Sequence, residues 1–375
     1  MKRRIAIGVF LSVLFIYLSF WTPDFSSLFS GKAGMFQALF GRSKIDLAEL
    51  GRAMAQANYI YLLFGVGLLL ASLIPRAERW RILIKPVSPG IRYWPVFNAM
   101  SAGYMVNNVL PLRMGELFRA YFVGTSEKIS KSSVLATIVV ERLLDVMSGV
   151  VLLAVTIFFF PFPEEYRRGL FILGAGMILG FAFLVSLLVN TRWTLKLLTA
   201  LLFPLPERFR HPILHAVEGF SGGLEILRSA HHYTAVFGYT ALLQVIYVIS
   251  AFFTLSAFDL VSPSYPIIYD NPLLASVVLL IFNTIGVAIP SAPGAVGTFH
   301  YVIASGVQLF GVTAEAAMGV AITLHLAQYI PLTLIGLICF WSQNFRIADL
   351  KKQIPQEAAG EVSTGSDESQ SVSHG

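Results

Sequence analysis

Long runs of apolar residues, separated by short polar connections, recur along the whole chain. A helix needs about 20 apolar residues to cross about 30 Å of hydrocarbon. The runs that approach or exceed this length are residues 5–21, 58–75, 134–160, 169–190, 233–258, 271–289 and 318–341, and a further run, 298–310, is short and interrupted. The pattern predicts an all-α, polytopic membrane protein with about eight transmembrane helices.

Two segments break this apolar pattern, one in each half of the chain. Residues 107–121 read NNVLPLRMGELFRAY, and residues 290–300 read PSAPGAVGTFH. Proline removes a backbone donor and clashes with the preceding turn, so neither segment is expected to be a continuous helix. Broken backbone and charge at membrane depth survive where they line a cavity or are buried in protein. Paired interruptions indicate a substrate pathway and, as a hypothesis, an inverted repeat.

The distribution of charge predicts the orientation. Hydrophobic residues make up 56% of the chain and charged residues 13%, and the net charge is +6. Most Lys and Arg, including Arg76 and Arg79, fall on the predicted side of the N-terminus, with only Arg142 inside a span. Because short cytoplasmic loops are enriched in Lys and Arg, both termini are predicted to be cytoplasmic, in the cell membrane. Residues 94–124 then start and end inside and residues 271–310 start and end outside, which predicts re-entrant broken helices approaching from opposite faces.

Six charged residues at predicted membrane depth are candidate binding residues. They form two clusters at helical spacing, Arg113, Glu116 and Arg119, then Glu141, Arg142 and Asp145. Residues three or four apart share a helix face, so ions within each cluster can pair. One interpretation is that they staple two helices together at the cytoplasmic boundary. The other is a site for an anionic headgroup, since the arginine fork matches phosphate oxygens, and Asn108 belongs to that candidate site.

The second break supplies uncharged candidates for the same site. Pro290, Gly294 and Gly297 interrupt the helix, and the backbone amides freed near the glycines are available to a substrate oxyanion. His300 follows directly, and histidine titrates near neutral pH. A histidine in such a place is more often a hydrogen-bonded structural group, and the same two interpretations apply to His325.

Three motifs together resemble a known family. NNVLPLRMGELFRAYFVG, ATIVVERLLDVMSGVVLL and IPSAPGAVGTFHYV resemble, in this order, the flippase-like transmembrane domain of lysylphosphatidylglycerol synthetases, over about residues 1–345. The resemblance implies a multi-pass helical fold with re-entrant helices that moves or presents lipid-linked headgroups between leaflets. The positions that match its pattern are Asn108, Pro111, Arg113, Gly115, Glu116, Arg119, Glu141, Arg142, Asp145, Pro290, Pro293, Gly294 and Gly297. Leu112 and His300 depart from it, standing where the family often has Gly and Glu, and His300 replaces a fixed anion with a titratable group.

The leading functional hypothesis is a flippase for an anionic-headgroup lipid or a polyprenyl-phosphate-linked glycolipid. The headgroup would cross through a polar cavity between the two broken segments, with Arg113 and Arg119 holding phosphate. The sequence has no G-x-x-x-x-G-K-[ST] loop, so an ion gradient or mass action would drive transport. One alternative is a membrane-embedded transferase on lipid-linked sugars, with Asp24, Asp46 and Glu49 as candidate carboxylates. The other is a non-catalytic partner of a cell-envelope lipid synthase.

The remaining features of the sequence narrow the class of protein. No metal-ligand set, nucleotide loop or nucleophile motif occurs, so we expect neither an enzyme nor a cofactor. Residues 1–345 are predicted to form the membrane-embedded domain, and the Ser-, Gly- and Glu-rich tail, 346–375, a disordered cytoplasmic segment. The 375 residues hold no aminoacyl-transfer domain, so lysyl-lipid synthesis by this chain is not expected. The expected partner is an anionic lipid, with a separate lipid-modifying enzyme or further copies of the chain as alternatives; nucleic acid is not expected, because the positive charge follows the membrane rule.

Overall fold

The computed structural model describes most of the membrane-embedded chain. The described residues are 2–30, 34–41, 43–110, 114–160, 164–204, 206–207, 210, 214, 217, 233–289 and 291–342. The predictions for Pro111, Leu112, Arg113, Pro290 and the tail 346–375 lie outside these residues. Within the described part the regular elements are helices, apart from one isolated bridge between Trp21 and Ser43. The predicted all-α class is confirmed.

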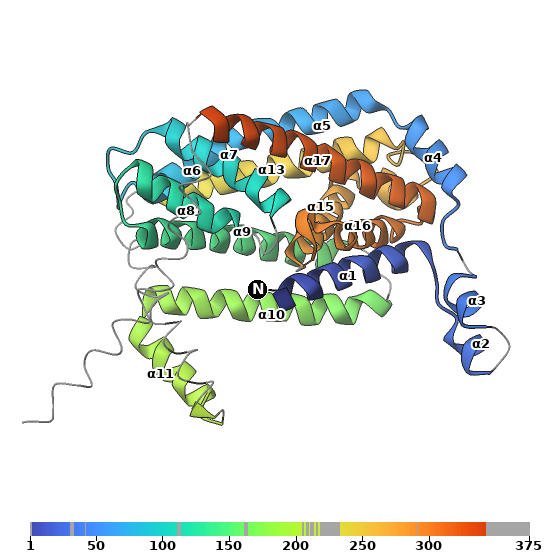
Figure 1. Ribbon diagram of the computed structural model, residues 1–375, viewed down its shortest axis with the longest axis horizontal. Coiled ribbons are helices and arrows are strands. Elements are labelled where there is room, and N and C mark those ends of the chain that lie inside the picture. Colours follow the sequence, from blue (N-terminus) through green and yellow to red (C-terminus); the bar gives the residue numbers. More distant parts are fainter. Residues whose placement is uncertain are drawn as a thin grey trace, which may run out of the picture.

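The helices differ in length, and the long ones lie roughly along the longest axis of the molecule (Figure 1). In chain order they are α1 (Lys2–Phe20), α2 (Phe25–Phe29), α3 (Met35–Phe40), α4 (Leu47–Gln56), α5 (Tyr59–Ala71), α6 (Leu73–Ile84), α7 (Tyr93–Val109), α8 (Gly115–Ser126), α9 (Lys131–Phe159), α10 (Glu164–Val189), α11 (Thr191–Leu201), α13 (Tyr233–Ala257), α14 (Pro266–Asp270), α15 (Pro272–Ala288), the 3₁₀ turn η2 (Pro293–Ala295), α16 (Thr298–Gln308) and α17 (Ala314–Ser342).

Each apolar run of the sequence coincides with one of these helices. Among the described residues, Tyr59–Ile84, Thr234–Ala257 and Ala314–Ser342 are long and apolar enough to cross a membrane. Shorter apolar helices cover Ile7–Phe20 and Pro272–Ala288. A polytopic membrane protein is therefore confirmed, whereas the number of eight crossings stays a prediction.

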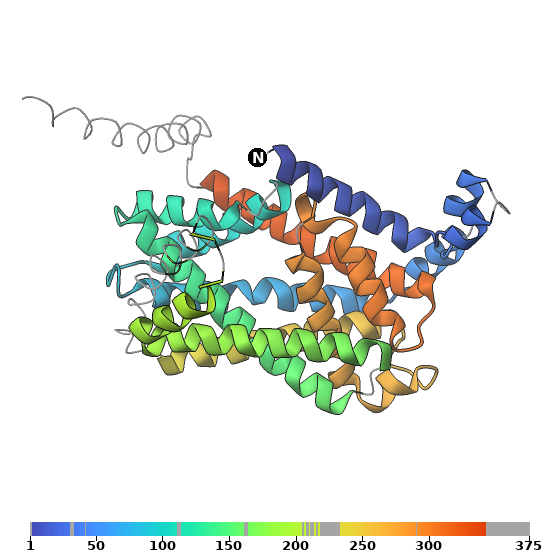
Figure 2. The ribbon, with the colours of Figure 1, turned by 90° about the horizontal axis from the view of Figure 1, so that it is seen from below.

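Two helical hairpins lie in opposite halves of the molecule. The helices α7, α8 and α9 have 17, 12 and 29 residues, and α15, α16 and α17 have 17, 11 and 29. In two perpendicular views α7 and α8 lie in one half and α15 and α16 in the other, while α17 runs through both (Figures 1 and 2). At 1.5 Å per residue α8 and α16 are each only about 17 Å long, well short of a bilayer. We call the gaps inside the hairpins the first break (residues 110–114) and the second break (residues 289–297).

The buried core divides in the same way as the hairpins. One cluster of buried apolar side chains joins α6, α7, α8 and α9 and includes Trp80 and Phe122. A second cluster joins α13, α15, α16 and α17 and includes Leu255 and Phe299. Each hairpin is therefore packed into its own core.

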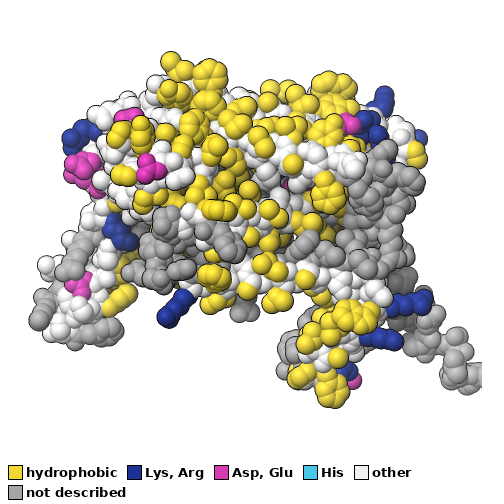
Figure 3. Space-filling view, turned by 180° about the vertical axis from the view of Figure 1, so that it is seen from behind, with side chains coloured by type: hydrophobic (Ala, Val, Ile, Leu, Met, Phe, Trp, Pro, Cys, Tyr) yellow, Lys and Arg dark blue, Asp and Glu magenta, His cyan; other side chains and the backbone are white. Residues whose placement is uncertain are grey.

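The outer surface between the two ends of the molecule is largely apolar. The face seen from behind shows apolar side chains across its middle, with Lys, Arg, Asp and Glu gathered toward its ends and lower edge (Figure 3). Large side chains such as Leu63, Ile172 and Leu179 are more than two-thirds exposed, at 71%, 76% and 70%. An exposed apolar surface of this size is stable in contact with lipid acyl chains, which supports the membrane location.

The first hairpin depends on a close approach of backbone at Gly115. A Cβ at this position would clash with the carbonyl oxygen of Gly103 on α7 and would lie 2.6 Å from Asn107 Oδ1. Asn107 Oδ1 accepts a hydrogen bond of 2.7 Å from the Gly115 amide, so the turn into α8 is fixed by these two helices together.

We expect Gly115→Ala to destabilise the protein by about 1–3 kcal/mol, because overpacking forces the two helices apart. The matched control is Gly67→Ala on α5, where a Cβ would meet nothing within 4 Å. Thermal unfolding of the purified variants in detergent compares them. Equal midpoints for the two variants would contradict the close approach.

Candidate functional site

A buried carboxylate on α9 is the centre of an ion network. Glu141 Oε2 accepts from Arg119 Nη2 of α8 at 2.5 Å, and Glu141 Oε1 lies 3.0 Å from Arg142 Nη2 and 3.5 Å from Arg79 Nη2 of α6. The Glu141 side chain is fully buried. It lies about 15 Å along the helix from Lys131, a distance comparable with half the hydrocarbon thickness.

A second carboxylate, Asp145, extends the network one helical turn further along α9. Asp145 Oδ1 accepts from Arg79 Nη2 at 2.6 Å, and Asp145 Oδ2 lies 3.5 Å from Arg142 Nη2. Arg79 Nη1 donates to Thr240 Oγ1 on α13 at 3.2 Å. The predicted shared face of Glu141 and Asp145 is confirmed, since both carboxylates contact Arg79.

Aromatic side chains cover the arginines. The Arg119 guanidinium lies 3.9 Å from the centre of the Trp80 ring, a cation–π distance. Arg76 Nη1 donates to the Tyr104 hydroxyl of α7 at 2.6 Å, and its guanidinium lies 5.4 Å from the Tyr247 ring of α13. We refer to Arg76, Arg79, Arg119, Arg142, Glu141 and Asp145 as the arginine network.

The prediction that Arg76 and Arg79 lie in a connection between helices is wrong, because both lie within α6; their placement on the cytoplasmic side stays a prediction. Arg79 is fully buried within α6, and Arg119 is also buried. The periodicity of the sequence could have shown that this segment is a packed helix. Leu73, Ala77, Trp80 and Ile84 recur along one buried face of α6. Arg76 and Arg79 each directly precede a residue of that face. Assigning Lys and Arg to loops by their position in the sequence does not take this helical periodicity into account.

The expected local pairing within the first cluster also changes. Arg119 pairs with Glu141, 22 residues away, and Glu116 accepts from Asn107 Nδ2 at 3.3 Å. Arg113 lies outside the described residues. The first cluster is thus divided between the arginine network and the turn into α8.

Positive charge and N–H donors exceed the protein's acceptors in the network. Three guanidinium groups share two carboxylates, and the fourth, that of Arg76, binds the Tyr104 hydroxyl. The buried Nε atoms of Arg76, Arg79, Arg119 and Arg142 have no hydrogen-bond partner among the described residues. The Arg142 side chain is 40% exposed and that of Asp145 is 25% exposed, so the network opens at this side.

The end of α7, just before the first break, is held by α17. Asn108, the penultimate residue of α7, donates from Nδ2 to Thr333 Oγ1 at 2.8 Å and to the Tyr329 carbonyl at 3.4 Å. The Tyr329 hydroxyl in turn donates to the Asn108 carbonyl at 3.4 Å. The second break reaches the same place, because a Cβ on Gly294 would lie 2.6 Å from Tyr329 and 3.5 Å from the Asn108 carbonyl oxygen.

The second break depends on glycine at Gly294, where φ is 71°. Its carbonyl oxygen lies 2.7 Å from His325 Nε2 of α17, so this nitrogen carries the proton. His300 Nδ1 accepts from the amide of Gly297 at 3.2 Å, and the two imidazole centres are 4.7 Å apart. The candidate residues therefore fall in two groups: Arg119, Glu141, Arg142 and Asp145 in the network, and Asn108, Gly294, Gly297 and His300 at the breaks.

Comparison of the sequence with known protein families gives a match. The family profile described as "Lysylphosphatidylglycerol synthase TM region" matches residues 5–336, which include both hairpins and the arginine network. The chain belongs to this family. The expected resemblance is therefore confirmed, and with it a membrane protein related to lipid handling.

Curated relatives of this family member are archaeal UPF0104 membrane proteins. That of Methanothermobacter thermautotrophicus is 22% identical over 307 residues, which cover 78% of this chain and 88% of the relative. That of Methanocaldococcus jannaschii is 28% identical over 150 residues, 39% of each chain, and that of Pyrococcus horikoshii is 27% identical over 158 residues, 40% of this chain and 46% of the relative. The chain thus matches about two fifths of the length of the Methanocaldococcus protein. No solved structure matches the chain.

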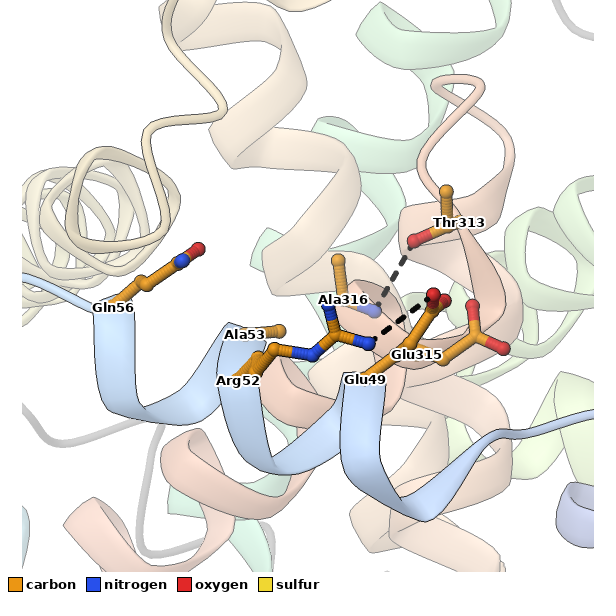
Figure 4. Close-up of a pocket in the computed structure, with 7 residues that line it drawn as sticks. All are labelled: Glu49, Arg52, Ala53, Gln56, Thr313, Glu315 and Ala316. Atoms are coloured by element: carbon orange, nitrogen blue, oxygen red, sulfur yellow. Dashed lines mark hydrogen bonds and ion pairs between the residues drawn. The ribbon is translucent and has the colours of Figure 1, made fainter.

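The carboxylates of the transferase hypothesis lie far along the chain from the network, in the segment before α5. Asp46 caps α4 by accepting from the amides of Ala48 and Glu49, and Asp24 accepts from the Ser27 amide at 3.0 Å. Glu49 lines an open pocket of about 190 Å³ between α4 and the start of α17, whose lining is shown in Figure 4: Glu49, Arg52, Ala53, Gln56, Thr313, Glu315 and Ala316. Asp24 and Asp46 thus have structural roles as helix and turn caps.

We expect Glu141→Gln to destabilise the protein by about 3–5 kcal/mol, because it leaves three arginines without their shared buried anion. The control is Glu49→Gln, which removes an exposed pair with Arg52 at 3.5 Å and is expected to cost about 0–1 kcal/mol. Thermal unfolding in detergent distinguishes the two. A Glu141→Gln protein as stable as Glu49→Gln would show that the network does not hold the helices together.

Proposed function

We propose that the protein is a flippase that carries the headgroup of an anionic lipid across the cell membrane. The observation that carries this proposal is the meeting of two helix breaks on α17 beside a buried network with surplus arginine. The headgroup would travel through the protein while the acyl or prenyl chains stay in the bilayer. Such transport requires no covalent step and no cofactor.

The two hairpins supply the mechanical part of the proposal. One helix of each hairpin, α8 or α16, is too short to cross a bilayer. The two hairpins lie in opposite halves of the molecule (Figures 1 and 2). In the proposed topology they are re-entrant, and both termini are cytoplasmic as the basic residues predict. Opposed broken helices around a central site are a recurring plan among transporters, in which one unit rocks against the other.

The arginine network supplies the electrostatic part. An ion at membrane depth is costly unless it is paired or hydrated. Arg142 is 40% exposed although it lies in the middle of a long α9. Such an arginine needs water or an anionic ligand at its open side, and its planar fork suits phosphate oxygens.

The proposal predicts that Arg142→Gln lowers lipid translocation about tenfold or more, the equivalent of one lost charge-assisted contact. The fold should survive, because Arg79 and Arg119 still pair with Glu141. Purified protein in vesicles carrying a trace of fluorescent phosphatidylglycerol or phosphatidic acid is assayed by the fraction of probe that an external quencher reaches over time.

Arg52→Gln is the matched control, since Arg52 is 68% exposed on α4. It should leave the rate unchanged. An Arg142→Gln rate equal to wild type would remove the network from the pathway. If the purified wild-type protein moves no lipid, the flippase proposal fails, and a non-catalytic partnership with a lipid-modifying enzyme takes its place.

A further inference from the structure

The arginine network carries a definite surplus of charge. Arg79, Arg119 and Arg142 pair with Glu141 and Asp145. Arg76 adds a fourth cation and binds the neutral Tyr104 hydroxyl, so the network holds two positive charges more than it has carboxylates. Arg79 and Arg119 each bind a carboxylate and are buried, so a ligand from outside does not reach them directly. The surplus therefore belongs to Arg76 and Arg142, which are both partly exposed.

These two arginines are arranged to leave donors free for a ligand. Among the described residues, the hydrogen bond of Arg76 goes to a neutral partner, the Tyr104 hydroxyl. Arg142 Nη2 is shared between Glu141 and Asp145, while its buried Nε has no protein acceptor. Buried donors without acceptors cost free energy that a bound anion recovers.

Polar groups around the open side add further contacts for an oxyanion. Gln244 Nε2 of α13 donates at 2.5 Å to Ser148 Oγ, one turn beyond Asp145 on α9, and Ser148 Oγ donates to the Asp145 carbonyl at 2.8 Å. The second amide hydrogen of Gln244, rather than the Ser148 hydroxyl, is therefore the donor for a ligand. The Tyr247 hydroxyl, also on α13, is buried without a partner among the described residues. Hydroxyl and amide groups of this kind bind phosphate oxygens beside arginine.

The open side also borders the lipid-facing surface. Val146, one turn from Arg142, is 46% exposed, and Val245, next to Gln244, is 54% exposed. A ligand whose charge sits in the network can therefore keep an apolar chain against α9 and α13. This favours an amphiphile over a free inorganic ion.

We infer that the arginine network binds a lipid-borne dianion, a phosphomonoester or diphosphate headgroup, in preference to a phosphodiester with one charge. Two negative charges neutralise the surplus of Arg76 and Arg142, whereas a single charge leaves a net cation at membrane depth. The inference rests on the proposed flippase function and specifies its substrate class.

The test compares phosphatidic acid, phosphatidylglycerol and phosphatidylcholine, each labelled on the acyl chain, in vesicles with the purified protein. At pH 8 we expect phosphatidic acid to cross about tenfold or more faster than phosphatidylglycerol. At pH 5 the advantage should shrink, because the second ionisation of a phosphomonoester falls near pH 6. Equal rates for the two anionic lipids at pH 8 would overturn the inference and leave the flippase proposal standing, whereas no movement of any lipid overturns the flippase proposal itself.

Variants of Arg76 assign the preference to the network. Arg76→Gln should abolish most of the advantage of phosphatidic acid over phosphatidylglycerol, and Arg76→Lys, which keeps the charge, should restore it. Arg81→Gln, which removes a pair with Glu78 on the same helix, should leave the ratio unchanged. An unchanged ratio in Arg76→Gln would overturn the assignment.

Free inorganic phosphate is the alternative ligand, because it carries the same negative charge as a phosphomonoester headgroup. Inorganic phosphate and short-chain phosphatidic acid are compared by the rise in unfolding temperature that each gives to the protein in detergent. A larger shift with the lipid, lost in Arg76→Gln, supports a lipid-borne dianion. A shift with inorganic phosphate as large as with the lipid would overturn the lipid part of the inference.

Discussion

The burial of Glu141 is the constraint on which half of this molecule depends. Its carboxylate is fully buried and is shared by arginines from α6, α8 and α9, so the positions of three helices are set by one anion. A buried ion pair is a poor means of stabilising a fold, because well-packed apolar residues often do as well or better. A network that holds more arginine than carboxylate is harder still to explain by stability. The excess of arginine is better explained by the binding of an anion than by a contribution to the stability of the fold.

The second constraint is the single face of α17 on which both helix breaks meet. His325, Tyr329 and Thr333 recur at intervals of four residues and so lie along one stripe of the helix. His325 contacts the Gly294 carbonyl, while Tyr329 and Thr333 contact Asn108. A movement of either hairpin relative to the other must change this stripe. At this stripe the two breaks are linked by a few directional hydrogen bonds, in addition to the packing of α17 against both cores.

Local features of this protein were accessible from sequence, and contacts across helices were not. Hydropathy located the helices, and Pro and Gly located both breaks, because each signal acts over a few residues. Spacing alone placed Glu141 and Asp145 on one face. Spacing failed for Arg119, whose partner Glu141 comes from another helix. It also gave no partner for Arg79, which is buried in α6 and does not lie, as predicted, in a connection between helices. His300 accepts the Gly297 amide, which is the structural role that its setting suggested.

The charge site and the meeting point of the breaks share one helix. On α7, Tyr104 binds Arg76 of the network, and Asn108, four residues later on the same face, binds α17. An anion that takes Arg76 as a partner competes with the Tyr104 hydroxyl for the same donors. Loss of that bond removes one contact between α7 and α6, while Asn108, one turn further along α7, keeps its contact with α17. In the proposed transport cycle, we expect headgroup binding to be coupled to movement of the first hairpin through these contiguous contacts.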